Sequence, residues 1–219
     1  MIAFDVNGTL SDLAPLADRL VDVGAPAHLL PTWFAGVLRD GIGLTAAGAY
    51  AEFSAVATGV LTTLLAPMQG LACEPGRAAA QVVEGFETLG VHPDVAAGVR
   101  ALADAGFRLI TLTNGSVADT KGLLERSGLL DPFTACLSVA EVRRWKPAPE
   151  PYLHAAAACQ VAPEAVMLVA VHPWDVDGAK RAGLQACWLD REGSRYPSHL
   201  IAPDRTTGGL TALLESLPG

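Results

Sequence analysis

The sequence has few charged residues, few aromatic residues and no long uninterrupted apolar run. Charged residues make up 17% of the 219 positions and aromatic residues 6%. No apolar run reaches the roughly 20 residues that a transmembrane helix needs. The chain begins Met-Ile-Ala-Phe-Asp, without the charged and apolar segments of a secretory signal. These absences predict a protein that is neither secreted nor embedded in a membrane, and we expect a cytoplasmic location.

Two further absences concern cysteine pairing and positive charge. The cysteines show no C-x-x-C spacing, and most of them stand in apolar runs. They are Cys73, Cys136, Cys159 and Cys187. This pattern predicts reduced, structural thiols rather than a disulfide or metal site. The formal net charge of −8 disfavours a nucleic acid or an anionic membrane as a partner, because either surface would repel the protein.

Apolar residues, by contrast, make up 51% of the chain, which predicts a large buried core. A chain of 219 residues suits one α/β core with a small inserted domain. Residues 2–6 are an apolar run followed by Asn7, Gly8 and Thr9. That pattern predicts a buried strand that ends in a tight turn.

The remainder of the chain divides into a helical segment and an alternating segment. From Asp12 to Gln81, stretches rich in Ala and Leu with helical spacing predict an inserted helical domain. Strands are then expected at 108–113, 134–139, 165–171 and 185–189, and helices at 93–105, 117–127, 149–159 and 174–182. Parallel strands need crossover helices. The sequence therefore predicts an α/β protein with a doubly wound parallel sheet.

Polar residues gather near the ends of the predicted strands. They are Asp5, Thr113, Asn114, Lys146, His172 and Asp175. Reactive groups in open α/β sheets collect at the carboxyl ends of the strands, where the connecting loops meet. A single aspartate at such a place is most simply a turn or cap residue. Several polar positions together indicate a functional site.

Four segments around these residues resemble the four motifs of the haloacid dehalogenase superfamily. They are Phe-Asp-Val-Asn-Gly-Thr-Leu, Leu-Thr-Asn-Gly-Ser, Lys-Pro-Ala-Pro-Glu-Pro-Tyr and His-Pro-Trp-Asp-Val-Asp-Gly-Ala-Lys. The resemblance is closest to the type II branch, the 2-haloacid dehalogenases, in which a helical cap is inserted between the first and second motifs. It implies a Rossmann-like core at 1–11 and 82–219 and a helical cap at 12–81.

The resemblance implies that Asp5 is a carboxylate nucleophile. Such a group must be ionised, and a nearby ammonium group favours the charged form, which is the implied role of Lys146. Thr9, Thr113 and Asn114 are implied to donate hydrogen bonds to the nucleophile or to a developing oxyanion. Thr113 and Asn114 have a plainer alternative as helix caps.

Two positions separate this chain from the phosphatases of the superfamily. Those enzymes carry a second aspartate two residues after the nucleophile, where this chain has Asn7, and an amide has no proton to exchange near neutral pH. They also bind Mg²⁺ through an aspartate pair in the last motif, and Val171 stands at the first of those positions. Displacing a halide requires neither a protonated leaving group nor a metal. The resemblance therefore implies dehalogenation with no cofactor and no metal.

In the implied reaction, Asp5 displaces halide from C2 of a small 2-haloacid, and water then hydrolyses the ester at the aspartyl carbonyl. Asp175 is the candidate for positioning or deprotonating that water, with His172 assisting. The family usually has asparagine where this chain has His172, and serine where it has Ala170. A histidine that only hydrogen-bonds the loop is the plainer alternative.

The largest departure from the type II pattern lies in the cap. Type II dehalogenases carry an arginine directly after a tryptophan to hold the departing halide, whereas here Phe34 follows Trp33. Arg39 is the candidate for reaching the same pocket, with a solvated helix residue as the alternative. Trp33, Phe34 and Trp174 are candidates for lining an apolar substrate pocket. For Trp33 and Phe34, a place in the core is the alternative.

The sequence thus predicts a metal-independent hydrolase whose partner is a small halogenated carboxylic acid. The apolar helices of the cap are typical of a surface that forms a homodimer. Two alternatives stay open. One is a phosphatase with altered Mg²⁺ ligation, and the other is a non-catalytic family member that binds a small anion.

Overall fold

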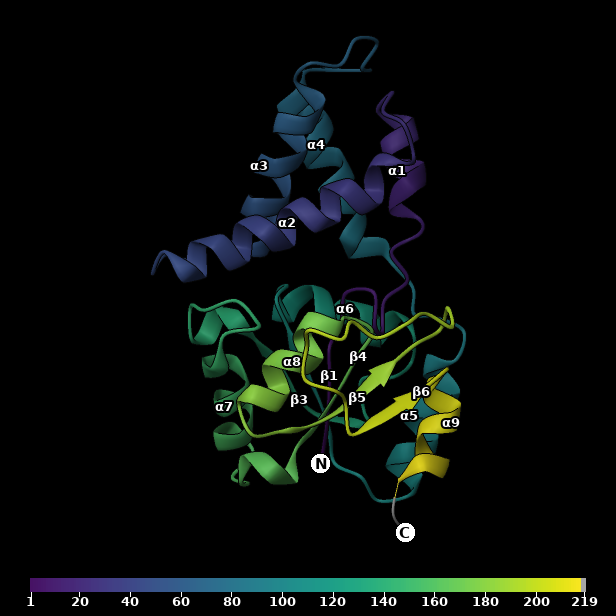
Figure 1. Ribbon diagram of the computed structural model, residues 1–219. Coiled ribbons are helices and arrows are strands. Elements are labelled where there is room, and N and C mark those ends of the chain that lie inside the picture. The colour runs from purple at the N-terminus through teal and green to yellow at the C-terminus, as the bar shows by residue number, and fades with distance from the viewer. Residues whose placement is uncertain (218–219) are drawn as a thin grey trace. The chain divides into compact units, whose positions relative to one another are not determined.

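The computed structural model describes residues 1–217, which form two compact units (Figure 1). The first unit contains Met1–Ser11 and the chain from Gly90 onward, and the second unit is Asp12–Leu89. Within residues 1–217, no helix combines the length and the apolar character that crossing a membrane requires.

The first unit is built on a six-stranded sheet with the strand order β3-β2-β1-β4-β5-β6, and all neighbouring strands run parallel. The strands are β1 (Ile2–Phe4), β2 (Leu109–Thr113), β3 (Phe133–Ser138), β4 (Met167–Ala170), β5 (Gln185–Leu189) and β6 (Arg205–Thr207). Strands β1, β2 and β4 are buried along their whole length, as expected when helices cover both faces of a parallel sheet. The predicted doubly wound α/β fold is confirmed.

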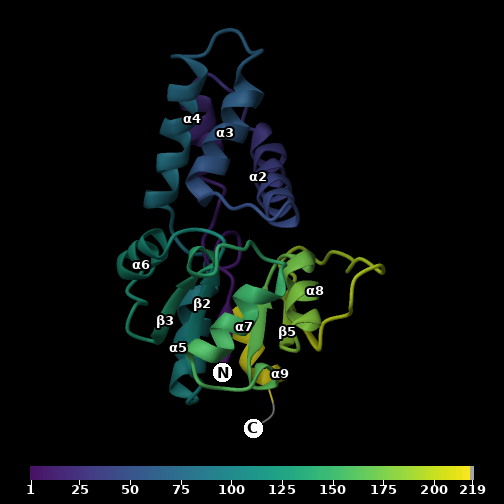
Figure 2. The same ribbon diagram turned by 90° about the vertical axis from the view of Figure 1, so that its left-hand side faces the viewer.

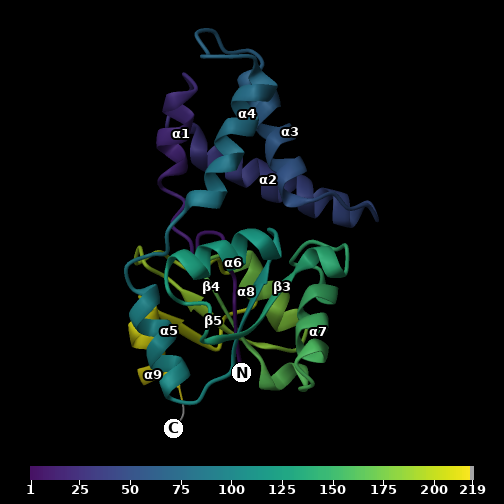
Figure 3. The same ribbon diagram turned by 180° about the vertical axis from the view of Figure 1, so that it is seen from behind.

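Helices cover both faces of this sheet (Figures 1 and 3). One face is covered by α5 (Val95–Asp104), α6 (Val117–Arg126) and α9 (Leu210–Ser216), and the other by α7 (Pro149–Ala158) and α8 (Pro173–Arg181). Successive β1 residues point to opposite faces, so Ile2 and Phe4 join the core under α5, whereas Ala3 joins the core under α7. The sheet therefore separates two hydrophobic cores.

The second unit is helical (Figure 2). It contains α1 (Leu16–Asp22), α2 (Leu29–Ala46), α3 (Phe53–Leu65), α4 (Pro75–Val83) and the 3-10 helix η1 (Glu84–Thr88). Phe86 of η1 packs edge-on against Trp33 and Phe53, with ring centroids 6.1 and 5.2 Å away. The unit therefore ends at Leu89, beyond the predicted boundary after Gln81, because α4 and η1 belong to the same core.

Short elements account for most other differences from the expected pattern. The 3-10 helices η2 (Val139–Glu141) and η3 (Pro163–Ala165) lie in loops of the first unit. β6 and α9 extend the alternation beyond the last predicted strand. The sequence has helical spacing at 33–38 and glycines after it, which predicts a short helix; α2 begins earlier, at Leu29, and continues through Gly41 and Gly43.

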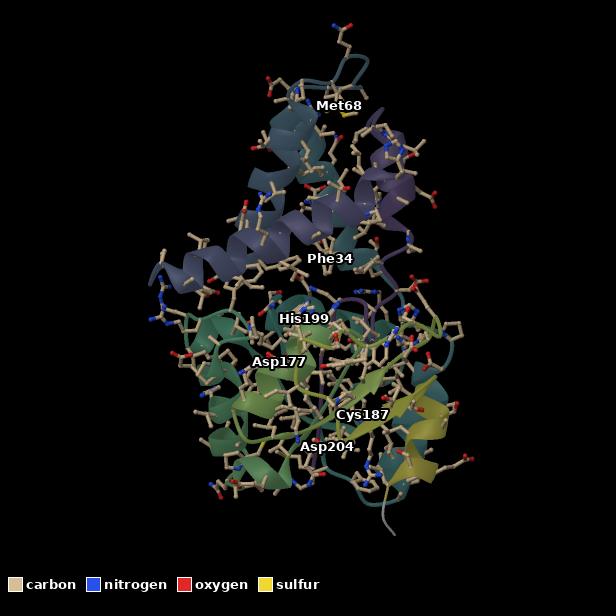
Figure 4. The ribbon with its side chains drawn as sticks, viewed as in Figure 1. Phe34, Met68, Asp177, Cys187, His199 and Asp204 are labelled. Atoms are coloured by element: carbon tan, nitrogen blue, oxygen red, sulfur yellow. The ribbon has the colours of Figure 1, made fainter. Side chains whose placement is uncertain are left out.

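The four cysteines are free. Cys159 and Cys187 are buried, and Cys187 lies on β5 (Figure 4). Burial raises the pKa of the Cys187 thiol to about 12, so this thiol stays protonated at neutral pH. These are the properties of a side chain that packs in a core.

Candidate active site

The candidate site lies at the carboxyl ends of β1 and β4. The chain leaves β1 and adds β2 and β3 on one side, then returns to add β4 and β5 on the other side, so the direction of winding reverses between β1 and β4. Ligands of open α/β sheets bind at such a switch point. Asp5 follows β1 directly, and its backbone N–H donates to the carbonyl of Val169 on β4 at 3.1 Å. His172 and Asp175 follow β4.

A tight turn holds Asp5 in place. We refer to residues 5–11 as the Asp5 loop. The carbonyl of Val6 accepts backbone N–H bonds from Leu10 at 2.9 Å and from Ser11 at 3.0 Å. Gly8 has a φ of +83°, a conformation that side chains with a Cβ adopt at a steric cost. The Asn7-Gly8-Thr9 turn predicted from the sequence therefore forms.

Lys146 links Asp5 to Asp175. The Nζ of Lys146 donates to Oδ1 of Asp5 at 2.8 Å, to Oδ2 of Asp175 at 2.6 Å and to the carbonyl of Leu112 at 2.9 Å. The side chains of Lys146 and Asp175 are 0% exposed, and that of Asp5 is 5% exposed. Buried charges persist only when they are paired and hydrogen-bonded, and these three groups meet that condition.

Tyr152 completes the arrangement and was not predicted from the sequence. Its hydroxyl donates to Oδ1 of Asp175 at 2.6 Å. Tyr152 lies in the same sequence motif as Lys146 and in the first buried turn of α7. That position could have indicated its role in the site. Gly178 of α8 lets these groups approach, because a Cβ there would lie 2.6 Å from the Tyr152 hydroxyl and 2.5 Å from Cβ of Pro147.

The charges of the buried groups set their pKa values. Burial alone would raise the pKa of Asp5, but the Lys146 ammonium, the His172 ring and the hydrogen bonds from Lys146 and Thr9 hold that pKa below its usual range. Burial would lower the pKa of Lys146, yet the carboxylates of Asp175 and Asp5 raise it. Burial and the charge of Asp5 raise the pKa of Asp175 against the pull of Lys146. At neutral pH the site therefore presents an ionised Asp5 beside an ammonium ion.

Thr9 and His172 surround the second oxygen of Asp5. The hydroxyl of Thr9 donates to Oδ2 of Asp5 at 2.7 Å and accepts the backbone N–H of Val171 at 3.1 Å. Nε2 of His172 lies 2.9 Å from the carbonyl oxygen of Asn7 and 3.7 Å from Oδ2 of Asp5. The His172 ring stacks on Trp174, with centroids 5.2 Å apart and an angle of 18° between the planes. The structure thus brings Thr9, His172 and Trp174 to Asp5 or its immediate neighbours.

Thr113 and Asn114 support the site through the backbone. Oγ1 of Thr113 accepts the N–H of Gly115 at 2.9 Å, and Oδ1 of Asn114 accepts the N–H of Lys146 at 3.0 Å. Ser138, at the end of β3, donates to the carbonyl of Gly115 at 2.6 Å. Asn114 therefore fixes the main chain of Lys146, a contact that was not predicted from the sequence.

The donor set does not fit Mg²⁺. That ion is bound by carboxylate oxygens, which here would come from Asp5 and Asp175. The ammonium of Lys146 lies between those two carboxylates and hydrogen-bonds to both. Val171, where the metal-binding members have an aspartate, has an apolar side chain, and its backbone N–H donates to Thr9. Lys146 therefore supplies positive charge between these carboxylates, and residues 1–217 contain no group of three or more His, Cys, Asp or Glu side chains that could hold a metal ion.

The remaining candidates lie in the second unit. Trp33 is buried, and its Nε1 donates to the carbonyl of Ala57 on α3 at 2.9 Å. This contact and the packing on Phe86 account for Trp33 as a core residue of the unit. Phe34 is half-buried on α2 (Figure 4). Arg39 has a side chain 74% exposed and paired with Asp40 at 2.7 Å, and it lines a depression of about 820 Å³ between α2 and α3.

The fold and the site define a class of protein: a doubly wound α/β protein with an ammonium-paired carboxylate at its switch point, an arrangement suited to nucleophilic catalysis. The family model of the haloacid dehalogenase-like hydrolases matches residues 1–183. The chain belongs to this family, as the motifs predicted.

Individual relatives cover nearly the whole chain. Haloacetate dehalogenase H-2 of Moraxella sp. (strain B) is 31% identical over 97% of this chain and 95% of that protein. (S)-2-Haloacid dehalogenase 1 of Pseudomonas sp. (strain CBS-3) is 30% identical over 92% of this chain and 88% of that protein. The solved structure of L-2-haloacid dehalogenase from Xanthobacter autotrophicus is similar with a TM-score of 0.87 and 25% identity, covering 98% of this chain and 96% of that one.

Proposed function

We propose that this protein hydrolyses the carbon–halogen bond of small 2-haloalkanoic acids through a covalent ester on Asp5. The observation that carries the proposal is the buried carboxylate of Asp5, which accepts a 2.8 Å hydrogen bond from the Lys146 ammonium and has a lowered pKa. The 31% identity to a haloacetate dehalogenase supports the substrate class.

The first step is a displacement at carbon. A carboxylate oxygen of Asp5 attacks C2 of the haloacid opposite the halogen, so that a C–O bond forms while the C–halogen bond breaks. Halide departs with the bonding electron pair, and no proton moves. Asp5 must be ionised for this attack, and Lys146 and Thr9 hold it in that state. Asn7 suits the same chemistry, because a halide leaves without an acid to protonate it.

The second step is hydrolysis of the ester. Water adds to Cγ of Asp5 and gives one proton to a base. The bond from Cγ to the oxygen that is attached to C2 then breaks, and that oxygen takes up the proton as the 2-hydroxy acid leaves. The second proton of the water passes to solvent, so that Asp5 is again a carboxylate with one oxygen from water. Asp175 is our candidate base, because burial raises its pKa and Lys146 holds it beside Asp5. Lys146 and Tyr152 each use one of its oxygens, and each carboxylate oxygen has a second lone pair for water. The proposed scheme assigns no step to a metal, and the positive charge between the two carboxylates comes from Lys146.

Several predicted residues enter the proposal as parts of the substrate site. Asn7, Thr113, Asn114 and Trp174 are proposed to contact the haloacid from the core. Phe34 and Arg39 of the helical unit stay predicted substrate-binding residues. A cytoplasmic location is supported by the four free thiols. Homodimer formation stays a prediction.

Mass spectrometry of the protein mixed with haloacids tests the function. With chloroacetate or 2-chloropropionate and EDTA present, we expect halide and 2-hydroxy acid in equal amounts. The peptide that contains Asp5 should gain the mass of the ester in quenched samples. Lack of both halide and ester with chloro-, bromo- and fluoro-acids would refute the proposal. Mg²⁺-dependent cleavage of an aryl phosphate would then favour a phosphatase, and haloacid binding without chemistry would favour an anion-binding protein.

His172 is proposed to stabilise negative charge at Asp5. A carbonyl oxygen only accepts hydrogen bonds, so the 2.9 Å contact with the Asn7 carbonyl places the proton on Nε2 of His172. That N–H lies 3.7 Å from Oδ2 of Asp5. The proposal is that the Asn7 carbonyl and the oxyanion that forms when water adds to the ester share this N–H, so that His172 acts as a donor rather than as a base through this nitrogen.

Replacement of His172 separates the donor from the base. His172→Leu removes the donor and is expected to slow ester hydrolysis by about 100-fold, so the ester on Asp5 accumulates. His172→Asn keeps an N–H donor and should stay within about 10-fold of the wild-type rate. Quenched-flow mass spectrometry of the Asp5 peptide measures both variants. Equal accumulation of ester in His172→Asn and His172→Leu would instead identify His172 as the base.

A further inference from the structure

The segment after β5 reaches back to the Asp5 loop through Arg191. Its guanidinium donates to the carbonyl of Thr9 at 2.9 Å through Nη2 and to the carbonyl of Gly8 at 3.5 Å through Nη1. Nε and Nη2 also bind the two carboxylate oxygens of Asp94, at 3.1 and 3.2 Å. The planar guanidinium suits this arrangement, because its donors leave in fixed directions toward several acceptors.

Asp94 gives Arg191 a fixed anchor. It stands directly before α5, and its Oδ2 also accepts the backbone N–H of Leu210 at the start of α9, at 2.8 Å. The side chains of Arg191 and Asp94 are only 19% and 21% exposed. The ion pair therefore ties the Asp5 loop to two helices of the core.

A short path of contacts leads from Arg191 to Asp5. Arg191 holds the backbone of Thr9, and the hydroxyl of Thr9 donates to Oδ2 of Asp5 at 2.7 Å. His92 makes a second hydrogen bond with the Asp5 loop, between its Nε2 and the carbonyl of Gly8 at 3.0 Å. A shift of Thr9 would move the donor of Asp5 and change the direction in which the carboxylate points.

We propose that Arg191, anchored by Asp94, is a positioning residue that fixes the Asp5 loop for attack on the substrate. The proposal rests on the proposed function of Asp5 as nucleophile. A misplacement of about 1 Å at a reacting group lowers rates by about 100-fold, so a residue that fixes the loop acts on the rate of ester formation.

A pocket beside Arg191 makes a rescue experiment feasible. It has a volume of about 360 Å³, and Gly8, His92, Arg191 and Trp188 are among the residues that line it. Shortening Arg191 to alanine would enlarge this space next to Asp94 and the two carbonyls. A free guanidinium ion carries the same planar donors and fits such a space.

Arg191→Ala is expected to slow ester formation by about 10- to 100-fold in single-turnover experiments. Millimolar guanidinium chloride should raise the rate of ester formation in Arg191→Ala several-fold. Arg191→Lys keeps the charge but not the planar set of donors, so its rate should lie between those of Arg191→Ala and the wild type. The affinity for haloacid should change less than the rate. Arg181→Ala is the control, because it removes an arginine from another 2.8 Å pair, with Asp177 in α8, and should keep the wild-type rate.

Hydrogen exchange gives a readout that needs no substrate. The N–H groups of Thr9 and Leu10 bond to the Val6 carbonyl, and they should exchange faster in Arg191→Ala than in Arg181→Ala. Unchanged exchange would overturn the proposal even if no haloacid reacts with the wild-type protein, a result that would separately remove the proposed function. The proposal would also be overturned if Arg191→Ala lowers the Tm together with the rate of ester formation, and if neither Arg191→Lys nor guanidinium chloride restores that rate.

Discussion

Asp5→Asn is expected to lower halide release by about 10⁴-fold or more, the scale of loss when a catalytic nucleophile is removed. A neutral amide oxygen is a poor nucleophile, so the ester of the proposed reaction does not form on residue 5. The peptide that contains residue 5 should gain no mass from 2-chloropropionate. Halide measured over hours and peptide mass measured on quenched samples check both statements.

The fold of this variant should persist, because asparagine keeps an oxygen that accepts from Lys146, and Asp175 still pairs with the ammonium. Asp204→Asn is a matched control. Asp204 also pairs with a lysine, Lys180, at 2.7 Å, but it lies beside Ala186 at the amino end of β5, away from the switch point (Figure 4). Its loss should leave turnover unchanged. Rapid halide release by Asp5→Asn would require another nucleophile and would remove the proposed mechanism.

The core and its central charges could be predicted because two physical rules agree with the motifs. Parallel strands bring their carboxyl ends to one edge, which placed Asp5 and Asp175 together, and a buried carboxylate nucleophile requires a cation, which Lys146 supplies. The structure adds that Lys146 contacts both carboxylates. That detail depends on side-chain direction in a loop 141 positions from Asp5, which no local pattern encodes.

Residues that act through their neighbours were harder to find. Tyr152 has the spacing of a core residue on α7, and it is one, but its hydroxyl also reaches Asp175. Arg191 stands in a polar stretch with no periodic pattern, and only the return of the chain after β5 brings it to Thr9. A lone arginine in such a stretch is typical of a solvated loop.

Packing explains where the expectations for the helical unit were least accurate. Gly36 is buried in α2, and a Cβ there would lie 2.8 Å from Val60 of α3, so the glycine allows the two helices to approach closely. From sequence alone, glycines in this stretch indicate helix ends, so α2 was expected to be shorter. For Trp33, the sequence left a substrate pocket and the core as alternatives, and its indole N–H finds a partner within the unit. The greater length of α2 arises because tertiary contacts override local preference.

Lys146→Met is expected to destabilise the folded protein by about 3–5 kcal/mol at pH 7, because it leaves two carboxylates buried without a cation. Lys146 is what offsets the burial of Asp5, so its removal raises the pKa of that carboxyl. A carboxyl whose folded pKa exceeds its unfolded pKa contributes stability below the unfolded pKa and loses it as pH rises through the folded value. The gap in unfolding free energy between variant and wild type should therefore shrink as pH falls toward 4. Urea unfolding at pH 4 and pH 7 measures it.

The same change is expected to abolish turnover, since Asp5 binds a proton and loses the charge that attacks C2. Lys180→Met is the control, because Lys180 pairs with Asp204 at a more exposed site and its loss should cost at most about 1 kcal/mol. Adding Asp175→Asn to Lys146→Met removes one of the two stranded carboxylates. The double variant should regain part of the stability at pH 7 and none of the activity. A Lys146→Met protein as stable as wild type at pH 7 would show that Asp5 and Asp175 do not depend on the ammonium for their burial, and the electrostatic account of the nucleophile would be wrong.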